Sequence, residues 1–151
     1  MTSYLIDVNV WLALSWEGHV HSVAATEWLS GRPKSATRLQ FCRTTQLGLL
    51  RLLTNGQVMG ASVLDLGQAW QVYDRWMEDP RVRFAGEAAG TDAAFRSASR
   101  VFASRPATKA IVDSYLVGLA MANKCAIVTF DNGLSQMAAS AGISLVRPGI
   151  Q

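Results

Sequence analysis

The sequence predicts an α/β fold with a mainly parallel sheet that helices cover on both faces. Strand-like apolar runs alternate with segments of helical periodicity along the whole chain. The runs at residues 4–6 and 126–128 are apolar throughout, which is typical of strands buried on both faces. Half of the residues are hydrophobic and 17% are charged, a globular composition, and we expect one domain over residues 1–151.

The first half of the chain predicts two strands and three helices. A buried apolar run makes residues 3–7 a strand, and a short helix is expected at residues 10–16. Residues 20–29 are amphipathic with helical spacing and stop before a Gly and a Pro. A weaker strand pattern covers residues 36–42. Leucines at helical spacing make residues 44–53 a helix, which the following Asn-Gly pair is expected to end.

The second half continues the alternation. An Asp-Pro pair ends a predicted helix at residues 65–77, and a short strand is expected after it. Thr108 is a plausible N-cap for a long helix that reaches about Asn123. Gly142 is the expected C-cap of the last helix. The remaining predicted strands are residues 82–84, 126–129 and 143–146, and the helices are residues 92–103, 108–123 and 134–141.

Charge and cysteine content narrow the function classes. The net charge of +3 permits a nucleic-acid partner. Two cysteines are too few for a secreted disulfide framework, so we expect reduced, buried thiols. The first residues lack the features of a signal peptide, and no apolar run approaches the ~18 residues of a membrane helix. We therefore expect a cytoplasmic protein without a membrane partner.

Three aspartates are candidates for one site. Asp7 ends the first strand and Asp131 follows the strand at residues 126–129. In parallel sheets the functional crevice lies outside the carboxyl ends of the strands, so both acids should lie there. Asp113 is the charged residue in an otherwise apolar stretch whose neighbours, including Ile111 and Val112, are expected to face a core. A carboxylate embedded there needs a partner, because an unpaired buried charge is costly.

Carboxylates that share a crevice repel one another unless a cation neutralises them. Mg²⁺ or Mn²⁺ with oxygen ligands suits such a site, and Thr129 and Asn9 supply neutral oxygens nearby. The chemistry would be metal-assisted attack on a phosphate. Each acid also has a plainer interpretation: Asp7 as a helix N-cap, Asp113 as a first-turn acid that favours the helix dipole, and Asp131 as a turn residue.

With these residues identified, the chain resembles the PIN-domain family, and within it the VapC-type toxins of bacterial type II toxin–antitoxin pairs. The segments that carry the resemblance are YLIDVNVWLAL, FCRTTQLGLLRLLTN and VDSYLVGLAMANKCAIVTFDNGL. The resemblance implies a three-layer α/β/α sandwich with a central parallel sheet. It implies Mg²⁺- or Mn²⁺-dependent endoribonuclease activity on RNA, a VapB-like antitoxin and a homodimer. The metal-binding, catalytic acids would be Asp7, Asp113 and Asp131, supported by Asn9 and Thr129.

One position departs from the family pattern. The family often has an acid where this chain has Gln46, which can still hydrogen-bond a metal-bound water but brings no charge. The alternative function is therefore a catalytically weakened PIN-like protein that binds RNA or an antitoxin. Arg43, Arg96 and Arg100 are candidate RNA contacts, although a solvated helix face would explain Arg96 and Arg100 equally well.

Other phosphate chemistries fit the residues less well. A phosphatase of the haloacid dehalogenase type wants a second Asp at position 9, where this chain has Asn. A receiver domain wants an early acid pair and a Lys after a late strand, and neither pattern is present. No Gly-x-Gly-x-x-Gly follows the first strand, which argues against dinucleotide binding.

Overall fold

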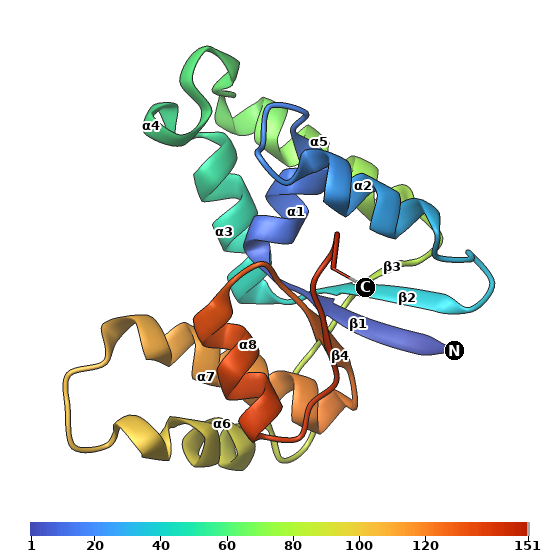
Figure 1. Ribbon diagram of the computed structural model, residues 1–151. Helices are drawn as coiled ribbons and strands as arrows, with labels where there is room; N and C mark the ends of the chain where they lie inside the picture. Colours follow the sequence, from blue (N-terminus) through green and yellow to red (C-terminus); the bar gives the residue numbers. More distant parts are fainter. Residues whose placement is uncertain (151) are drawn as a thin grey trace.

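A computed structural model describes residues 1–150 and contains a five-stranded parallel sheet with the strand order β3-β2-β1-β4-β5. In Figure 1 helices α1 to α5 lie on one side of this sheet and helices α6 to α8 on the other. The predicted three-layer α/β/α sandwich is therefore confirmed. The strands are β1 (Thr2–Ile6), β2 (Thr37–Phe41), β3 (Val82–Phe84), β4 (Ala126–Val128) and β5 (Leu145–Val146).

The helices fill the connections between the strands, as parallel pairing requires. Two are one-turn 3-10 helices, η1 (Gly60–Ser62) and η2 (Arg100–Phe102). The α-helices are α1 (Val8–Ser15), α2 (Ser22–Ser30), α3 (Arg43–Leu53), α4 (Gly56–Met59), α5 (Leu66–Glu78), α6 (Thr91–Ser99), α7 (Thr108–Asn123) and α8 (Asn132–Ser140). None of the helices within residues 1–150 has both the length and the apolar character of a membrane span.

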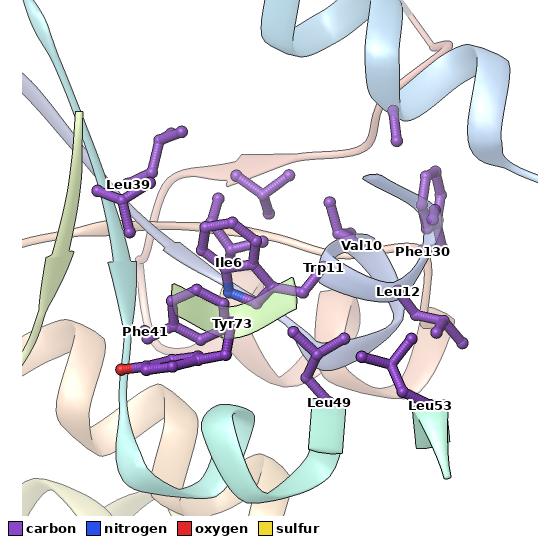
Figure 2. Close-up of a cluster of buried hydrophobic side chains, with 14 of the residues drawn as sticks. Ile6, Val10, Trp11, Leu12, Leu39, Phe41, Leu49, Leu53, Tyr73 and Phe130 are labelled. Carbon is purple, nitrogen blue, oxygen red and sulfur yellow. The ribbon is translucent and has the colours of Figure 1, made fainter. Parts of the chain in front are cut away.

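The alternation of side chains along β1 builds two hydrophobic cores. Tyr4 and Ile6 belong to the core under α1, α2, α3 and α5, whereas Leu5 belongs to the core under α7 and α8. Successive side chains of a strand point to opposite faces, so a strand between two helical layers must be apolar at every position. Figure 2 shows the larger core, in which Trp11 lies beside Phe41 and Tyr73.

The predicted elements are all present, with three local corrections. The predicted stop at the Asn-Gly pair is confirmed, since α3 ends at Leu53, but the Asn55 side chain also accepts a hydrogen bond from the Gln57 amide and starts α4, which was not predicted. Thr108 is the first residue of α7 rather than its N-cap, and Ala107 at the cap position gives no side-chain hydrogen bond. The last strand is shorter than predicted. Both cysteines are free and buried, as expected.

Gly118 allows the close packing of α6 against α7. A Cβ atom built on Gly118 would lie 2.5 Å from the backbone nitrogen of Phe95 and 2.7 Å from its Cα. Backbone atoms cannot move aside as the end of a flexible side chain can, so this position requires a glycine. The α6–α7 hairpin is held in place by this contact, and α7 carries Asp113.

Candidate active site

The carboxyl ends of β1 and β4 place two of the predicted acids at one edge of the sheet. These strands are hydrogen-bonded neighbours, with Ile6 paired to Val128. Asp7 directly follows β1, and its backbone N–H donates to the carbonyl of Val128 at 2.9 Å. Asp131 follows β4 after two further residues. Both therefore lie outside the carboxyl ends of adjacent strands, which is where α/β sheets place ligands.

Asp7 is a buried carboxylate whose two oxygens have different partners. One accepts a hydrogen bond from the backbone of Val8 at 2.8 Å, which caps α1. The other accepts a hydrogen bond from the hydroxyl of Thr129 at 2.7 Å. Burial raises the pKa of Asp7, and the Thr129 and Val8 hydrogen bonds oppose that rise. The N-cap interpretation of Asp7 is therefore correct, and the same carboxylate also lies in the candidate site.

Thr129 links the first acid to the second. Its Oγ1 donates to Asp7 and accepts a hydrogen bond from the backbone N–H of Asp131 at 2.9 Å. Asp131 is exposed, and one of its oxygens caps α8 by accepting from the Leu134 amide at 2.8 Å. It is thus an N-cap rather than an ordinary turn residue. The fully buried Thr129 hydroxyl sets the spacing of the two aspartates.

Asp113 approaches the same place from α7. It is the sixth residue of that helix, so it is not a first-turn acid and the helix-dipole interpretation is wrong. Burial, together with the charges of Asp131 and Asp7, raises its pKa to about 6, and Lys109 opposes the rise. The three acids therefore interact electrostatically across 124 residues of chain, from position 7 to position 131.

The surroundings of Asp113 differ from the prediction. Ile111 and Val112 do not face a core, because their side chains are 57% and 46% exposed. Leu116 and Leu119 on the other side of the helix are buried as expected. Asp113 therefore lies at the boundary between a buried face and an exposed apolar rim, which leaves its carboxylate accessible to a ligand.

The donor set suits a hard divalent cation. Carboxylate and hydroxyl oxygens are the ligands that Mg²⁺ and Mn²⁺ prefer. Within residues 1–150, no three acidic, histidine or cysteine side chains are close enough to form a complete protein cage for a metal ion. Mg²⁺ typically keeps several of its waters and takes only one or two carboxylates directly, so it does not require such a cage.

Gln46 is buried on α3, and its side-chain oxygen is already engaged. Arg43 donates to the Gln46 carbonyl oxygen at 2.5 Å. The guanidinium of Arg43 also lies over the ring of Phe84, 4.8 Å from its centre. The Gln46 side chain therefore orients the guanidinium group of Arg43. The Asn9 side chain is exposed on α1, two residues after Asp7.

The other predicted RNA contacts lie on the outer helical hairpin. Arg96 on α6 forms an exposed ion pair with Asp92 at 2.7 Å, and Arg100 is exposed in η2. Their contact with RNA remains a prediction. Arg147 was not among the predicted residues; it follows β5 and donates to the side chain of Asn132 at 2.5 Å. Its position directly after the last predicted strand was the available signal.

Replacing Thr129 with Val tests the link between the two strands. The change keeps the shape of the side chain but leaves one oxygen of the buried Asp7 carboxylate without its donor. We expect a loss of about 1.5–3 kcal/mol in the free energy of unfolding at pH 7. Urea denaturation measures it, with the exposed Thr26→Val as the matched control. A loss equal to that of the control would contradict the role of the Thr129 hydroxyl.

The sequence of this chain is similar to those of known proteins. The sequence pattern of the PIN domain matches residues 4–140. Ribonuclease VapC41 of Mycobacterium tuberculosis (strain ATCC 25618 / H37Rv) is 40% identical over 138 residues, which cover 87% of this chain and 91% of the relative. Ribonuclease VapC29 of the same strain is 33% identical over 137 residues, covering 88% and 89%.

Solved structures share the fold at low sequence identity. VapBC2 from Rickettsia felis, bound to a DNA fragment from its promoter, superposes with a TM-score of 0.72 at 10% identity and covers 97% of this chain and 99% of that one. Mycobacterium tuberculosis VapC20, a toxin that cleaves the sarcin–ricin loop, gives a TM-score of 0.64 at 18% identity, covering 96% and 99%. By its sequence pattern, its relatives and its fold, this chain belongs to the PIN-domain family.

Proposed function

We propose that this protein is a divalent-metal-dependent endoribonuclease that hydrolyses RNA phosphodiester bonds and acts as the toxin of a toxin–antitoxin pair. The observation that carries the proposal is the approach of Asp113 to Asp7 and Asp131 at the carboxyl edge of the sheet. Carboxylates whose charges raise the pKa of a neighbouring acid favour a bound cation that neutralises them. The ribonuclease names of the relatives indicate RNA as the substrate class.

Each acid has a distinct place in this site. Asp7, Asp113 and Asp131 would hold Mg²⁺ or Mn²⁺ directly or through water. The ion, when bound, supplies activation of water and stabilisation of charge on the phosphate. Thr129 holds the Asp7 carboxylate in one orientation, and the Val8 amide fixes its other oxygen. The hydrogen bonds of Asp131 to Leu134 and of its amide to Thr129 keep that acid at the end of β4.

The partner inferred for this toxin is a VapB-like antitoxin. Three of the structures that share the fold are VapBC complexes, from Rickettsia felis, Haemophilus influenzae and Salmonella typhimurium. The relatives' names also weigh against a catalytically weakened binding protein, since they are ribonucleases. A homodimer remains a prediction from the family resemblance.

Cleavage of mixed cellular RNA by the purified, antitoxin-free protein tests the proposal. We expect fragments with Mg²⁺ or Mn²⁺ and none with excess EDTA. Restoring the metal after EDTA should restore cleavage, which separates metal dependence from damage to the protein. A folded protein that binds RNA but cuts none with either metal would overturn the ribonuclease and favour the binding protein.

The pKa of Asp113 predicts how metal binding depends on pH. Below about pH 6 its carboxyl group is largely protonated, and a proton must leave before the group can hold a cation. We expect the apparent Mg²⁺ affinity to fall up to about tenfold for each pH unit below 6 and to change little above pH 7. The measurement is the Mg²⁺ concentration for half-maximal cleavage at pH 5, 6 and 7. An affinity independent of pH across this range would contradict the assignment.

A further inference from the structure

Two arginines flank the acidic site along the carboxyl edge of the sheet. Arg43 is the first residue of α3 and comes just after the end of β2, and Arg147 directly follows β5. In the strand order, β2 and β5 lie on either side of the β1–β4 pair that carries Asp7 and Asp131. The carboxyl edge of the sheet therefore has an arginine on each side of the carboxylates of Asp7 and Asp131.

Both guanidinium groups are oriented by side-chain amides. Arg43 donates to Gln46 and Arg147 donates to Asn132, the residue after Asp131. An amide oxygen accepts these hydrogen bonds without carrying a charge, so it holds the guanidinium in place and leaves the positive charge uncompensated. The ion pairs within residues 1–150 are formed by other arginines, Arg81 with Asp79 and Arg96 with Asp92.

The surroundings of these two arginines favour contact with a ligand. Arg43 is exposed and Arg147 is half-buried, so both can be reached from solvent. The Arg43 guanidinium also packs on the ring of Phe84, which already restricts its conformations. Less conformational entropy is therefore lost when this group binds a ligand. Guanidinium groups that are pre-oriented and uncompensated are suited to phosphate oxygens, which they bind through paired hydrogen bonds.

We propose that Arg43 and Arg147 bind RNA phosphates on opposite sides of the cleaved bond, so that the strand runs along the sheet edge from β2 to β5. This inference rests on the proposed ribonuclease function. Three inter-strand steps separate β2 from β5, about 14 Å, which assigns the arginines to different phosphates of one strand. The inference also explains what a neutral Gln46 contributes, because an acid at this position would pair with Arg43 and compensate its charge.

RNA affinity tests the proposal without relying on cleavage. A fluorescent single-stranded RNA is titrated in Mg²⁺ with protein carrying Asp113→Asn, alone or combined with Arg43→Ala, Arg147→Ala or both. We expect each arginine change to weaken binding on the order of threefold to tenfold at low salt. Each should reduce the slope of log affinity against log salt by about 0.7, the value for one phosphate contact on a single strand.

Arg38→Ala is the matched control. Arg38 is exposed near the start of β2, at the opposite edge of the sheet, and its removal changes the net charge by the same amount. We expect it to leave both affinity and salt slope nearly unchanged. Equal losses in Arg38→Ala and the two test variants would overturn the proposal, because they would indicate a non-specific effect of charge. Unchanged binding in both test variants, or no RNA binding by the parent protein, would overturn it too.

Gln46→Glu separates the role of Arg43 from a general loss of structure. The new carboxylate should pair with Arg43, so this variant should bind RNA as weakly as Arg43→Ala while the arginine is still present. Arg43→Lys, which keeps the positive charge, should recover part of the affinity and most of the salt slope. RNA affinity equal to the parent in Gln46→Glu would overturn the assignment of Gln46. Because these measurements report binding, an absence of cleavage in the wild-type protein would count against the proposed function alone.

Discussion

Asp113→Asn is expected to abolish RNA cleavage while the protein remains folded. Asparagine has nearly the same shape but removes one of the three charges that would hold the cation. Changes in the outer shell of a metal site typically cost roughly 10–100-fold in affinity or activity, so we expect a loss of at least about 100-fold for a direct or water-mediated ligand. Initial rates of RNA cleavage at saturating Mg²⁺ measure it. Retained activity would remove Asp113 from the site.

The same substitution should stabilise the metal-free protein at neutral pH. The folded-state pKa of Asp113 is raised to about 6 from an ordinary value of 3.8, so the folded state binds the extra proton more tightly than the unfolded state does. Stability therefore falls as pH rises from about 4 to about 6, and the wild-type protein carries this cost at pH 7.5. Allowing for solvent screening of a partly exposed group, we expect Asp113→Asn to gain about 1 kcal/mol, or about 2–4 °C in Tm.

The pH dependence of the stability gain in Asp113→Asn serves as a control. At pH 4 the wild-type Asp113 carboxyl group is already protonated, so the variant should have no advantage there. Asp74→Asn on the exposed surface of α5 is a matched substitution outside the site and should give little change at either pH. A destabilised Asp113→Asn protein at pH 7.5 would contradict the repulsion that we infer among the three acids.

Trp11→Ala is expected to have the largest effect on stability. The indole is fully buried, stacks on Phe41 with ring centres 3.8 Å apart, and meets Trp76 edge-on at 5.3 Å. Removing a buried tryptophan leaves a cavity among residues from α1, β2 and α5, which typically costs about 3–5 kcal/mol. Urea denaturation measures the loss. Trp11 belongs to α1, which Asp7 caps, so cleavage should also fall in this variant.

Two further variants show whether the loss comes from the stacked core. Trp70→Ala removes the same side chain from α5, where it is 41% exposed, and should cost no more than about 1 kcal/mol. Trp11→Phe keeps an aromatic ring against Phe41 and removes an indole N–H that has no hydrogen-bond partner within residues 1–150. It should therefore lose clearly less than Trp11→Ala. Equal losses in the Ala variants at positions 11 and 70 would contradict this account.

The elements were predictable because their signals are local. The strand at Val82–Phe84 has the predicted bounds, and β1 and α7 differ from prediction by one residue or none. The errors came from signals with two meanings. An Asn-Gly pair can end one helix and start the next: α3 ends at Leu53 as predicted, but the Asn55 side chain also caps α4, which was missed. The apolar residues Ile111 and Val112 suggested a core, but the structure leaves both of them exposed on α7.

Local sequence patterns were enough to predict the five strands, most of the helices, the layered α/β fold and the position of Asp7 and Asp131 at strand ends. Apolar runs, helical periodicity and the parallel βα alternation carry that information locally. Three features could be seen only in the folded chain: β1 and β4 are neighbours, the Thr129 hydroxyl joins their acids, and Gln46 and Asn132 orient arginines at both ends of the edge. Those contacts depend on strand order and register, which the packing of two cores on opposite faces of the sheet selects over the whole chain.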